Sequence, residues 1–268
     1  MSFSISGKTA IVTGAANGVG LAIGRHFLEQ GANVVFADMD EGALNRELGE
    51  LAKEEGSARI FAGDLRKKLT IANLLSATVQ AFDRVDILVN AARQVLRTDP
   101  LDPDDISMEE LLQQNLFSAL RLSQAVARKM VKQAADDEGE GPIGSIVNLS
   151  SIAARRTRPD LMAYSVSNAA LDQMTRSFAV AMAEKRIRVN AVAFGSVMSA
   201  SLKGELKAHE EMRETILDST PLNRIANPSE VSDAVQYLAS DAAAFVTGQI
   251  LTVDGGRTLV DAASSSAH

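Results

Sequence analysis

No cysteine occurs among the 268 residues of the sequence. Its absence excludes disulfide bonds, thiolate metal ligands and cysteine nucleophiles together. Histidine is scarce as well: His26, His209 and His268 are far apart and fit no metal-binding spacing such as HExxH. We therefore expect neither a metal site nor a Ser-His-Asp hydrolase.

Aromatic residues are few, and basic residues are outnumbered by acidic ones. Tryptophan is absent and aromatic residues make up 4% of the chain, which leaves little to stack on nucleobases. The 27 Lys and Arg residues against 34 Asp and Glu residues give a net charge of -7, which disfavours binding to polyanions. We expect no nucleic-acid partner.

Long hydrophobic runs are missing too. No stretch approaches the roughly 18 apolar residues of a membrane span, and residues 1–8 lack the features of a signal peptide. The simplest expectation is a soluble cytoplasmic protein. With 268 residues, 46% of them hydrophobic, the chain is long enough for one domain with one core. A flexible tail is expected at about residues 260–268.

Seven short runs rich in β-branched residues alternate with longer segments of helical period. The runs are mostly continuously apolar, which is typical of parallel strands covered on both faces. We therefore predict an α/β fold of three layers, with helices on both faces of a doubly wound parallel sheet of about seven strands. The predicted strands span residues 9–13, 34–37, 60–62, 87–89, 146–149, 189–192 and 250–253. The predicted helices span residues 21–29, 43–55, 71–82, 108–134, 161–183 and 229–239.

A glycine-rich loop, TGAANGVG at residues 13–20, follows the first predicted strand and leads into a helix. Glycine lets the backbone approach a pyrophosphate closely, and the start of a helix directs free N–H groups at it. The spacing G-x-x-x-G-x-G differs from the G-x-G-x-x-G fingerprint, so the loop alone is a moderate signal. The cofactor-binding residues predicted here are Gly14, Asn17, Gly18, Val19 and Gly20.

Acidic residues end or follow the next two strands. Asp38 can accept hydrogen bonds from both hydroxyls of an adenosine ribose and would repel a 2′-phosphate. Met39 follows it and no Lys or Arg is adjacent, so the sequence favours NAD over NADP. The alternative is a loop acid that caps the next helix. Asp64, followed by Leu65, could reach an adenine amino group, and the alternative is a simple turn aspartate.

Further motifs follow in order along the chain. Asn90 follows the fourth predicted strand, Asn115 lies in a long helical segment, and the fifth strand ends in VNLSS at residues 147–151. Tyr164 comes next, then VNAV at residues 189–192, and TGQ at 247–249 before VDGG at 253–256. Together with the glycine loop and its two acids, these motifs make the chain resemble the short-chain dehydrogenase/reductase family over about residues 8–258.

This resemblance implies a Rossmann-like subunit of a homodimer or homotetramer that binds a nicotinamide cofactor. It implies reversible hydride transfer between an alcohol and a carbonyl compound, both small molecules. It also implies that Ser151 polarises the substrate oxygen, that Tyr164 is the acid/base, and that Asn115 disturbs its helix and binds a relay water. The further cofactor contacts that it implies are Asn90, Ala91, Tyr164, Asn168, Gly195, Val197 and Ser199.

One position departs from the family at the centre of this chemistry. The family's lysine stands four residues after the tyrosine, and here that position is Asn168. A cation about 5 Å from a phenolate is worth roughly 3 kcal/mol at an effective dielectric of about 20. Asparagine can bond to ribose hydroxyls but carries no charge, so we expect weakened or altered catalysis. The alternative is an inactive NAD-binding pseudoenzyme that acts as a sensor or assembly subunit.

Two more departures are Arg93, where the family usually has glycine, and Phe194, where it commonly has proline. One hypothesis is that Arg93 partly supplies the missing charge. Another is that Arg93 or other arginines bind an anionic group of the substrate. The alternative to both is a set of solvated arginines that pair with the excess of acids. The other arginines concerned are Arg97, Arg155, Arg156 and Arg158.

A charged helical segment, residues 202–217, lies where the family carries its substrate-covering flap. Its apolar residues could close a lid over the substrate. The alternative is a packed surface helix. The apolar residues are Leu202, Leu206, Met212, Ile216 and Leu217.

Overall fold

A computed structural model describes residues 2–52 and 56–261 of the protein. Its seven strands pair in parallel in one sheet, in the order β3-β2-β1-β4-β5-β6-β7. The order reverses between β1 and β4, so the chain winds outward from this point in both directions. The strands are β1 (Thr9–Thr13), β2 (Asn33–Asp38), β3 (Ala58–Ala62), β4 (Ile87–Asn90), β5 (Gly144–Ser151), β6 (Ile187–Phe194) and β7 (Ile250–Val253).

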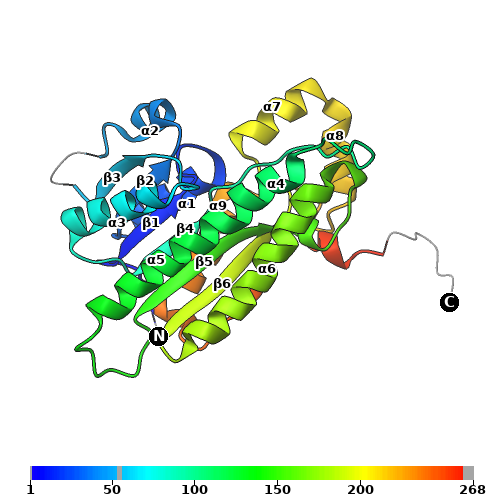
Figure 1. The fold of residues 1–268 in the computed structure, drawn as a ribbon. Coiled ribbons are helices and arrows are strands. Elements are labelled where there is room, and N and C mark those ends of the chain that lie inside the picture. Colours follow the sequence, from blue (N-terminus) through cyan, green and yellow to red (C-terminus); the bar gives the residue numbers. More distant parts are fainter. Residues whose placement is uncertain (1, 53–55, 262–268) are drawn as a thin grey trace.

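Helices cover both faces of the sheet (Figure 1). One face packs against α1 (Gly18–Glu29), α2 (Glu41–Leu48) and α9 (Pro228–Ala239). The other packs against α3 (Lys68–Phe82), α5 (Ser118–Gln133) and α6 (Met162–Ala183). The short α4 (Ser107–Leu111) precedes α5, and α7 (Ala200–Ala208) and α8 (Glu210–Asp218) follow β6. None of the helices within the described ranges combines the length with the apolar character that a bilayer crossing demands.

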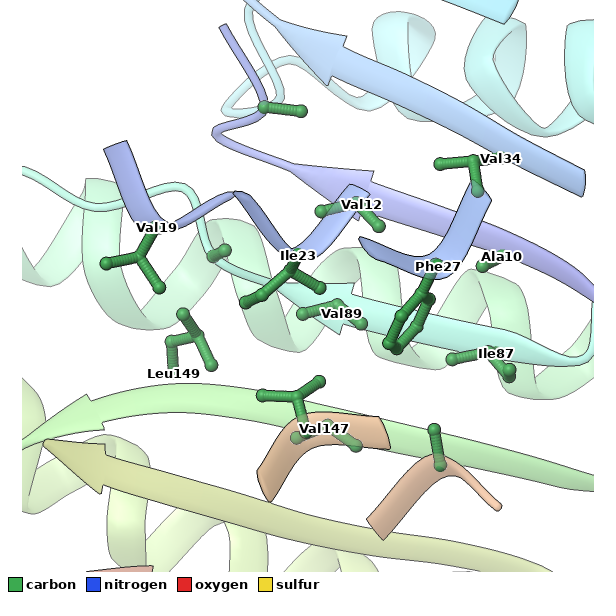
Figure 2. Close-up of a cluster of buried hydrophobic side chains, with 14 of the residues drawn as sticks. Ala10, Val12, Val19, Ile23, Phe27, Val34, Ile87, Val89, Val147 and Leu149 are labelled. Atoms are coloured by element: carbon green, nitrogen blue, oxygen red, sulfur yellow. The ribbon is translucent and has the colours of Figure 1, made fainter. Parts of the chain in front are cut away.

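Alternate residues of each strand enter different cores on the two faces. Ala10 and Val12 of β1 point to the α1 side, whereas Ile11 points to the α3 side. Figure 2 shows the first of these cores, where Ile23 and Phe27 of α1 lie among side chains of β1, β4 and β5. Because both faces of these strands are buried, they are apolar at successive positions. This burial explains the continuous apolar runs in the sequence.

The predicted fold class is confirmed. All seven predicted strands are present, and each predicted boundary lies within two residues of the observed one. The three layers and the parallel, doubly wound sheet also agree with the prediction. Of the predicted tail at residues 260–268, only Val260 and Asp261 lie within the described part of the chain.

Three predicted helices differ from the observed ones. The helix predicted for residues 43–55 ends at Leu48, before Gly49, whose residue type has a low helix propensity; of its predicted end, residues 53–55 lie outside the described ranges. The helix predicted for residues 108–134 is interrupted by a π-helical turn, Leu112–Phe117. The flap segment breaks into α7 and α8 at His209, which has the non-helical angles φ -140° and ψ 83°.

The start of α9 carries a capping box with an ion pair. The carboxylate of Glu230 accepts a hydrogen bond from the backbone N–H of Asn227 at 2.8 Å. It also accepts two from Arg224, at 2.7 and 2.5 Å. The Arg224 hydrogen bonds lower the pKa of Glu230 to about 2. Ionised Glu230 therefore stabilises the fold above its ordinary pKa, and this contribution is lost as the pH falls from about 4.5 towards 2.

We expect Glu230→Gln to lower the free energy of unfolding at pH 7 by about 0.5–1 kcal/mol, because a neutral amide caps less well and pairs weakly with Arg224. The difference from the parent should shrink as the pH falls below 4.5, since Glu230 itself then becomes protonated. Denaturant unfolding at a series of pH values measures both. Glu214→Gln, at an exposed position of α8, is the control, and a difference that is independent of pH would contradict the assignment.

Candidate active site

Loops at the carboxyl ends of the strands enclose a cleft of about 470 Å³. It lies beside the point where the strand order reverses, the place at which open α/β sheets bind ligands. Most of the predicted cofactor residues line it: Gly14, Asn17, Gly18, Val19, Gly20, Asp38, Met39, Asp64, Leu65, Ala91, Gly195, Val197 and Ser199. Residues outside that predicted set line it too, among them Arg93, Gln114 and Phe194, and Leu202 and Glu205 of α7.

The glycine loop touches the end of β4 at a contact that leaves no room for a side chain. Gly14 has a φ of +63°, and a Cβ atom there would lie 2.7 Å from the carbonyl oxygen of Ala91. The hydroxyl of Thr13 accepts hydrogen bonds from the backbone N–H groups of Ala91 and Ala92, both at 3.0 Å. This clamp places the start of α1, at Gly18, against the cleft. Thr13 itself was not among the predicted site residues.

Asp38 and Asp64 both line the cleft, and both also hold local backbone. Asp38 accepts hydrogen bonds from the N–H of Ala16 in the glycine loop and from that of Asp40, each at 3.1 Å. The two carboxylate oxygens of Asp64 accept bonds from Arg66 at 2.9 and 3.0 Å. These bonds lower the pKa of Asp64. The hydrogen bonds of Asp64 match the alternative of a turn aspartate, although its position at the cleft keeps the adenine contact a prediction.

Asn90 lies beneath the cleft rather than along it. Its buried amide donates to the hydroxyl of Ser123 at 3.0 Å and to the side-chain oxygen of Asn148 at 2.8 Å. These bonds tie β4 to α5 and to β5. The structure therefore gives the Asn90 side chain a supporting position, and its predicted contact with a cofactor stays a prediction.

The predicted catalytic pair comes from the end of β5 and the first turn of α6. Ser151 is the last residue of β5, and its hydroxyl oxygen accepts a hydrogen bond from the N–H of Ala153 at 3.1 Å. The hydroxyl hydrogen of Ser151 is thus free for another acceptor. Tyr164 is 5% exposed, and its side chain packs in a small cluster with Leu111 and Ala163. Neither Ser151 nor Tyr164 is among the residues that line the cleft.

Asn115 lies in the π-helical turn, as the resemblance implied for a locally disturbed helix. Its amide group exchanges two hydrogen bonds with the backbone of Gln94: the oxygen accepts from the N–H at 2.8 Å and the nitrogen donates to the carbonyl at 3.0 Å. The same nitrogen donates to the hydroxyl of Ser167 at 3.1 Å, and Ser167 donates to the carbonyl oxygen of Tyr164 at 2.9 Å. Asn115 therefore joins the loop after β4 to α6.

Asn168 is turned along its own helix. Its amide nitrogen donates to the carbonyl oxygen of Tyr164, one turn earlier, at 2.8 Å, and the residue is 2% exposed. It does not line the cleft. The amide hydrogen bonds that we expected it to offer to ribose hydroxyls are thus directed, in part, at the backbone.

Arg93 reaches Tyr164 from the loop after β4. One guanidinium nitrogen, Nη1, donates to the phenol oxygen of Tyr164 at 3.0 Å. The guanidinium carbon lies 4.2 Å from the centroid of the Phe194 ring, which is cation–π geometry. Two positions that we interpreted as departures from the family pattern therefore contact each other beside the tyrosine. The residue types at positions 93 and 194 drew attention to both residues, but their separation in the sequence did not indicate that they are in contact.

The remaining arginines of the hypothesis make other contacts. Arg158 forms two hydrogen bonds with Asp160, at 3.1 and 2.9 Å, and Arg97 lies 3.9 Å from the same carboxylate. Arg155 donates to the hydroxyl of Thr252, and Arg156 donates to the carbonyl oxygen of Thr258. None of these four lines the cleft within the described part of the chain. The contacts of Arg97 and Arg158 agree with the alternative that these arginines pair with acidic residues.

Comparisons with known proteins agree with this architecture. A family model described as enoyl-(acyl carrier protein) reductase matches residues 14–258. Galactitol 2-dehydrogenase (L-tagatose-forming) of Cereibacter sphaeroides is 37% identical, over 96% of this chain and 97% of the relative. The chain belongs to the short-chain dehydrogenase/reductase family. The recognition made from the sequence motifs is confirmed at this level.

Hydroxysteroid dehydrogenases are also similar to this short-chain dehydrogenase/reductase. The 7alpha-hydroxysteroid dehydrogenase of Escherichia coli (strain K12) is 33% identical, over 94% of each chain. A solved structure of 7alpha-hydroxysteroid dehydrogenase, complexed with NADH and 7-oxo glycochenodeoxycholic acid, superposes with a TM-score of 0.85 at 33% identity and covers 95% of each chain. The fold is thus shared with this structure over 95% of the chain.

The contact between Gly14 and β4 can be tested by stability. We expect Gly14→Ala to lower the free energy of unfolding by at least about 2 kcal/mol, because the new Cβ collides with backbone and the positive φ adds strain. Gly7→Ala is the matched control: Gly7 has a φ of +76° but no atom within 4 Å of an added Cβ, so about 1 kcal/mol of strain alone is expected. Equal losses in the two variants would contradict the tight contact.

Proposed function

We propose that this protein is an NAD-dependent oxidoreductase that transfers a hydride between the cofactor and a small-molecule alcohol or carbonyl compound. One observation carries the proposal: Arg93, in the wall of the glycine-lined cleft where α1 begins, contacts the phenol of Tyr164. The relatives named above are dehydrogenases, which supports catalysis over the alternative of an inactive sensor or assembly subunit.

The residues at the cleft fit a nicotinamide dinucleotide. Gly18 has a φ of +56° and no atom within 4 Å of an added Cβ, so its backbone is open to a pyrophosphate at the start of α1. Asp38 suits the two hydroxyls of an unphosphorylated ribose, and its charge disfavours a 2′-phosphate, which supports NAD over NADP. When bound, such a cofactor supplies or accepts the hydride.

Ser151 and Tyr164 act on the substrate oxygen in this proposal. In the direction of reduction, both hydroxyls donate hydrogen bonds to the carbonyl oxygen, and the phenol of Tyr164 gives its proton to the oxygen as the alcohol forms. In the direction of oxidation, the phenol oxygen takes the proton of the alcohol. Water held at the π-helical turn of Asn115 exchanges that proton with solvent.

We take Asn168 to stand where the family has its lysine, since it follows Tyr164 by four residues. Its amide bonds the backbone carbonyl of Tyr164 and brings no charge to the phenol. Asn168 by itself should therefore make proton removal from an alcohol slower than in relatives that have the lysine, because it places no positive charge beside the phenol.

We infer that the substrate lies under α7. Leu202 and Glu205 of this helix line the cleft, and the side chain of Ser199 caps the helix by accepting from the N–H of Leu202 at 3.2 Å. This position supports the lid interpretation of the flap over that of a packed surface helix. The anionic substrate group, the homodimeric or homotetrameric assembly and the cytoplasmic location stay predictions.

The proposal is tested with purified protein, NADH and NADPH. The chain contains no tryptophan, so cofactor fluorescence can be followed without protein emission from that residue. We expect NADH to bind more tightly than NADPH and to be oxidised with some member of a panel of ketoses and oxosteroids. Tyr164→Phe should keep NADH affinity and lose turnover by at least about 100-fold, because the phenol supplies the proton. Binding without turnover across the panel would contradict the proposal.

The preference for NAD should depend on the charge of Asp38. Asp38→Asn keeps an oxygen that can accept from Ala16 but removes the charge, so we expect the ratio of NADPH to NADH affinity to rise by about tenfold. Asp40→Asn is the control, because Asp40 caps α2, a role that asparagine can fill, and does not line the cleft. An unchanged ratio in Asp38→Asn would show that this carboxylate does not select the cofactor.

A further inference from the structure

We propose that Arg93 is the positioning cation of this active site: its guanidinium holds the Tyr164 phenol with the phenol hydrogen directed at the substrate, and it places a positive charge beside the phenol oxygen. The inference rests on the proposed function, because it assigns a task to Arg93 within the same reaction. Arg93 lies on the loop after β4, whereas Tyr164 lies on α6.

The direction of the hydrogen bond is settled by chemistry. An arginine has only donors, so the phenol oxygen must accept the bond from Arg93 Nη1 at 3.0 Å. The hydrogen of the phenol is then left for a different acceptor. Within the described residues, no other side chain forms a hydrogen bond to this oxygen. Arg93 therefore orients the phenol as a donor towards whatever oxygen enters the site.

The Arg93 side chain is held at both of its ends. At the far end, the guanidinium stacks on Phe194, the last residue of β6. At the near end, the backbone of the adjacent Gln94 forms two hydrogen bonds with the side chain of Asn115, one through its N–H and one through its carbonyl oxygen. Arginine at the exposed rim of a cleft usually has many conformations, and these two attachments restrict it to the one that meets Tyr164.

The same network fixes the tyrosine. Asn115 donates to Ser167, and Ser167 donates to the carbonyl oxygen of Tyr164. Asn115 thus positions both partners of the Arg93–Tyr164 contact. An arginine that was merely solvated at the surface would not need hydrogen bonds that fix the loop after β4 relative to α6.

The charge of Arg93 acts on a buried phenol. Tyr164 is 5% exposed, and the guanidinium of Arg93 lies within hydrogen-bond distance of its phenol oxygen, so the positive charge acts on the phenol with little intervening water. Asp172 is buried on the same helix but lies eight residues after Tyr164. The charged groups of the neighbouring segments are engaged elsewhere or exposed. Arg155 and Arg156 bond to Thr252 and Thr258, Arg158 and Arg97 lie against Asp160, and Glu109 and Glu110 of α4 are exposed.

The composition of the chain offers a direct measurement. It has two tyrosines, Tyr164 and Tyr237, and no tryptophan, so the ultraviolet absorbance of tyrosinate reports on few groups. Tyr237→Phe, on α9, leaves Tyr164 as the single phenol. In this background we expect the tyrosinate absorbance of Arg93→Met to appear at a higher pH than in its parent, because methionine places no charge beside the phenol oxygen. Arg93→Lys, which keeps the charge, should stay closer to the parent than Arg93→Met does.

Kinetics supply the second measurement. Arg93→Met should lower kcat for alcohol oxidation by about tenfold or more, move its pH profile upward, and change NADH affinity much less. Arg121→Met is the matched control, since Arg121 also lies over a phenylalanine ring, Phe117, but does not line the cleft. It should change neither the absorbance titration nor kcat by more than about twofold.

Two results would overturn the inference. An identical tyrosinate titration in Arg93→Met and its parent would show that the guanidinium does not act on the phenol. A rise of turnover in Arg93→Met would show that the side chain obstructs the cleft. The titration needs no turnover, so a wild-type protein that oxidises no alcohol would contradict the proposed function while the titration still decides the role of Arg93. Circular dichroism confirms that each variant is folded.

Discussion

The close approach of the glycine loop to the end of β4 is the constraint on which the cleft depends. Gly14 has no Cβ and a positive φ, so its backbone can lie against Ala91 and Ala92, and the Thr13 hydroxyl bonds the N–H groups of both. The contact occurs between β1 and β4, where the strand order reverses. Because α1 starts from one side of it and the Arg93 loop from the other, one local contact sets the distance between the two walls.

A second layer of hydrogen bonds extends from this contact to Tyr164. Asn90 and Asn148 tie β4 to β5 below the cleft, and Asn115 ties the loop after β4 to α6 above it. The π-helical turn makes the second connection possible, because it changes the direction of side chains within an otherwise regular helical segment. The placement of Tyr164 is therefore a property of three elements and not of α6 alone.

Much of the fold could be predicted from the sequence, because its central strands are buried on both faces and each strand is marked by a short apolar run. Helix ends were harder: the low propensity of Gly49 ended α2 early, and the break at His209 carries no sequence signal of comparable strength. In the site, the glycine loop and Asp38 could be found, since their chemistry depends on residue type and on position after a strand. The contact of Arg93 with Phe194 and Tyr164 could not, because these residues come from three separate elements.

The sequence by itself determined the family, the parallel three-layer fold and many of the residues that line the cleft at the carboxyl edge of the sheet. These follow from local patterns: apolar runs, glycine spacing and polar residues at strand ends. Only the tertiary structure decided which atoms the side chains of Asn168 and Arg93 contact. Asn168 turns to the backbone of its own helix, and Arg93 reaches the phenol of Tyr164 from the loop after β4. A side chain as long as arginine can point in many directions, and the packing of Phe194 and Asn115 around it selects one.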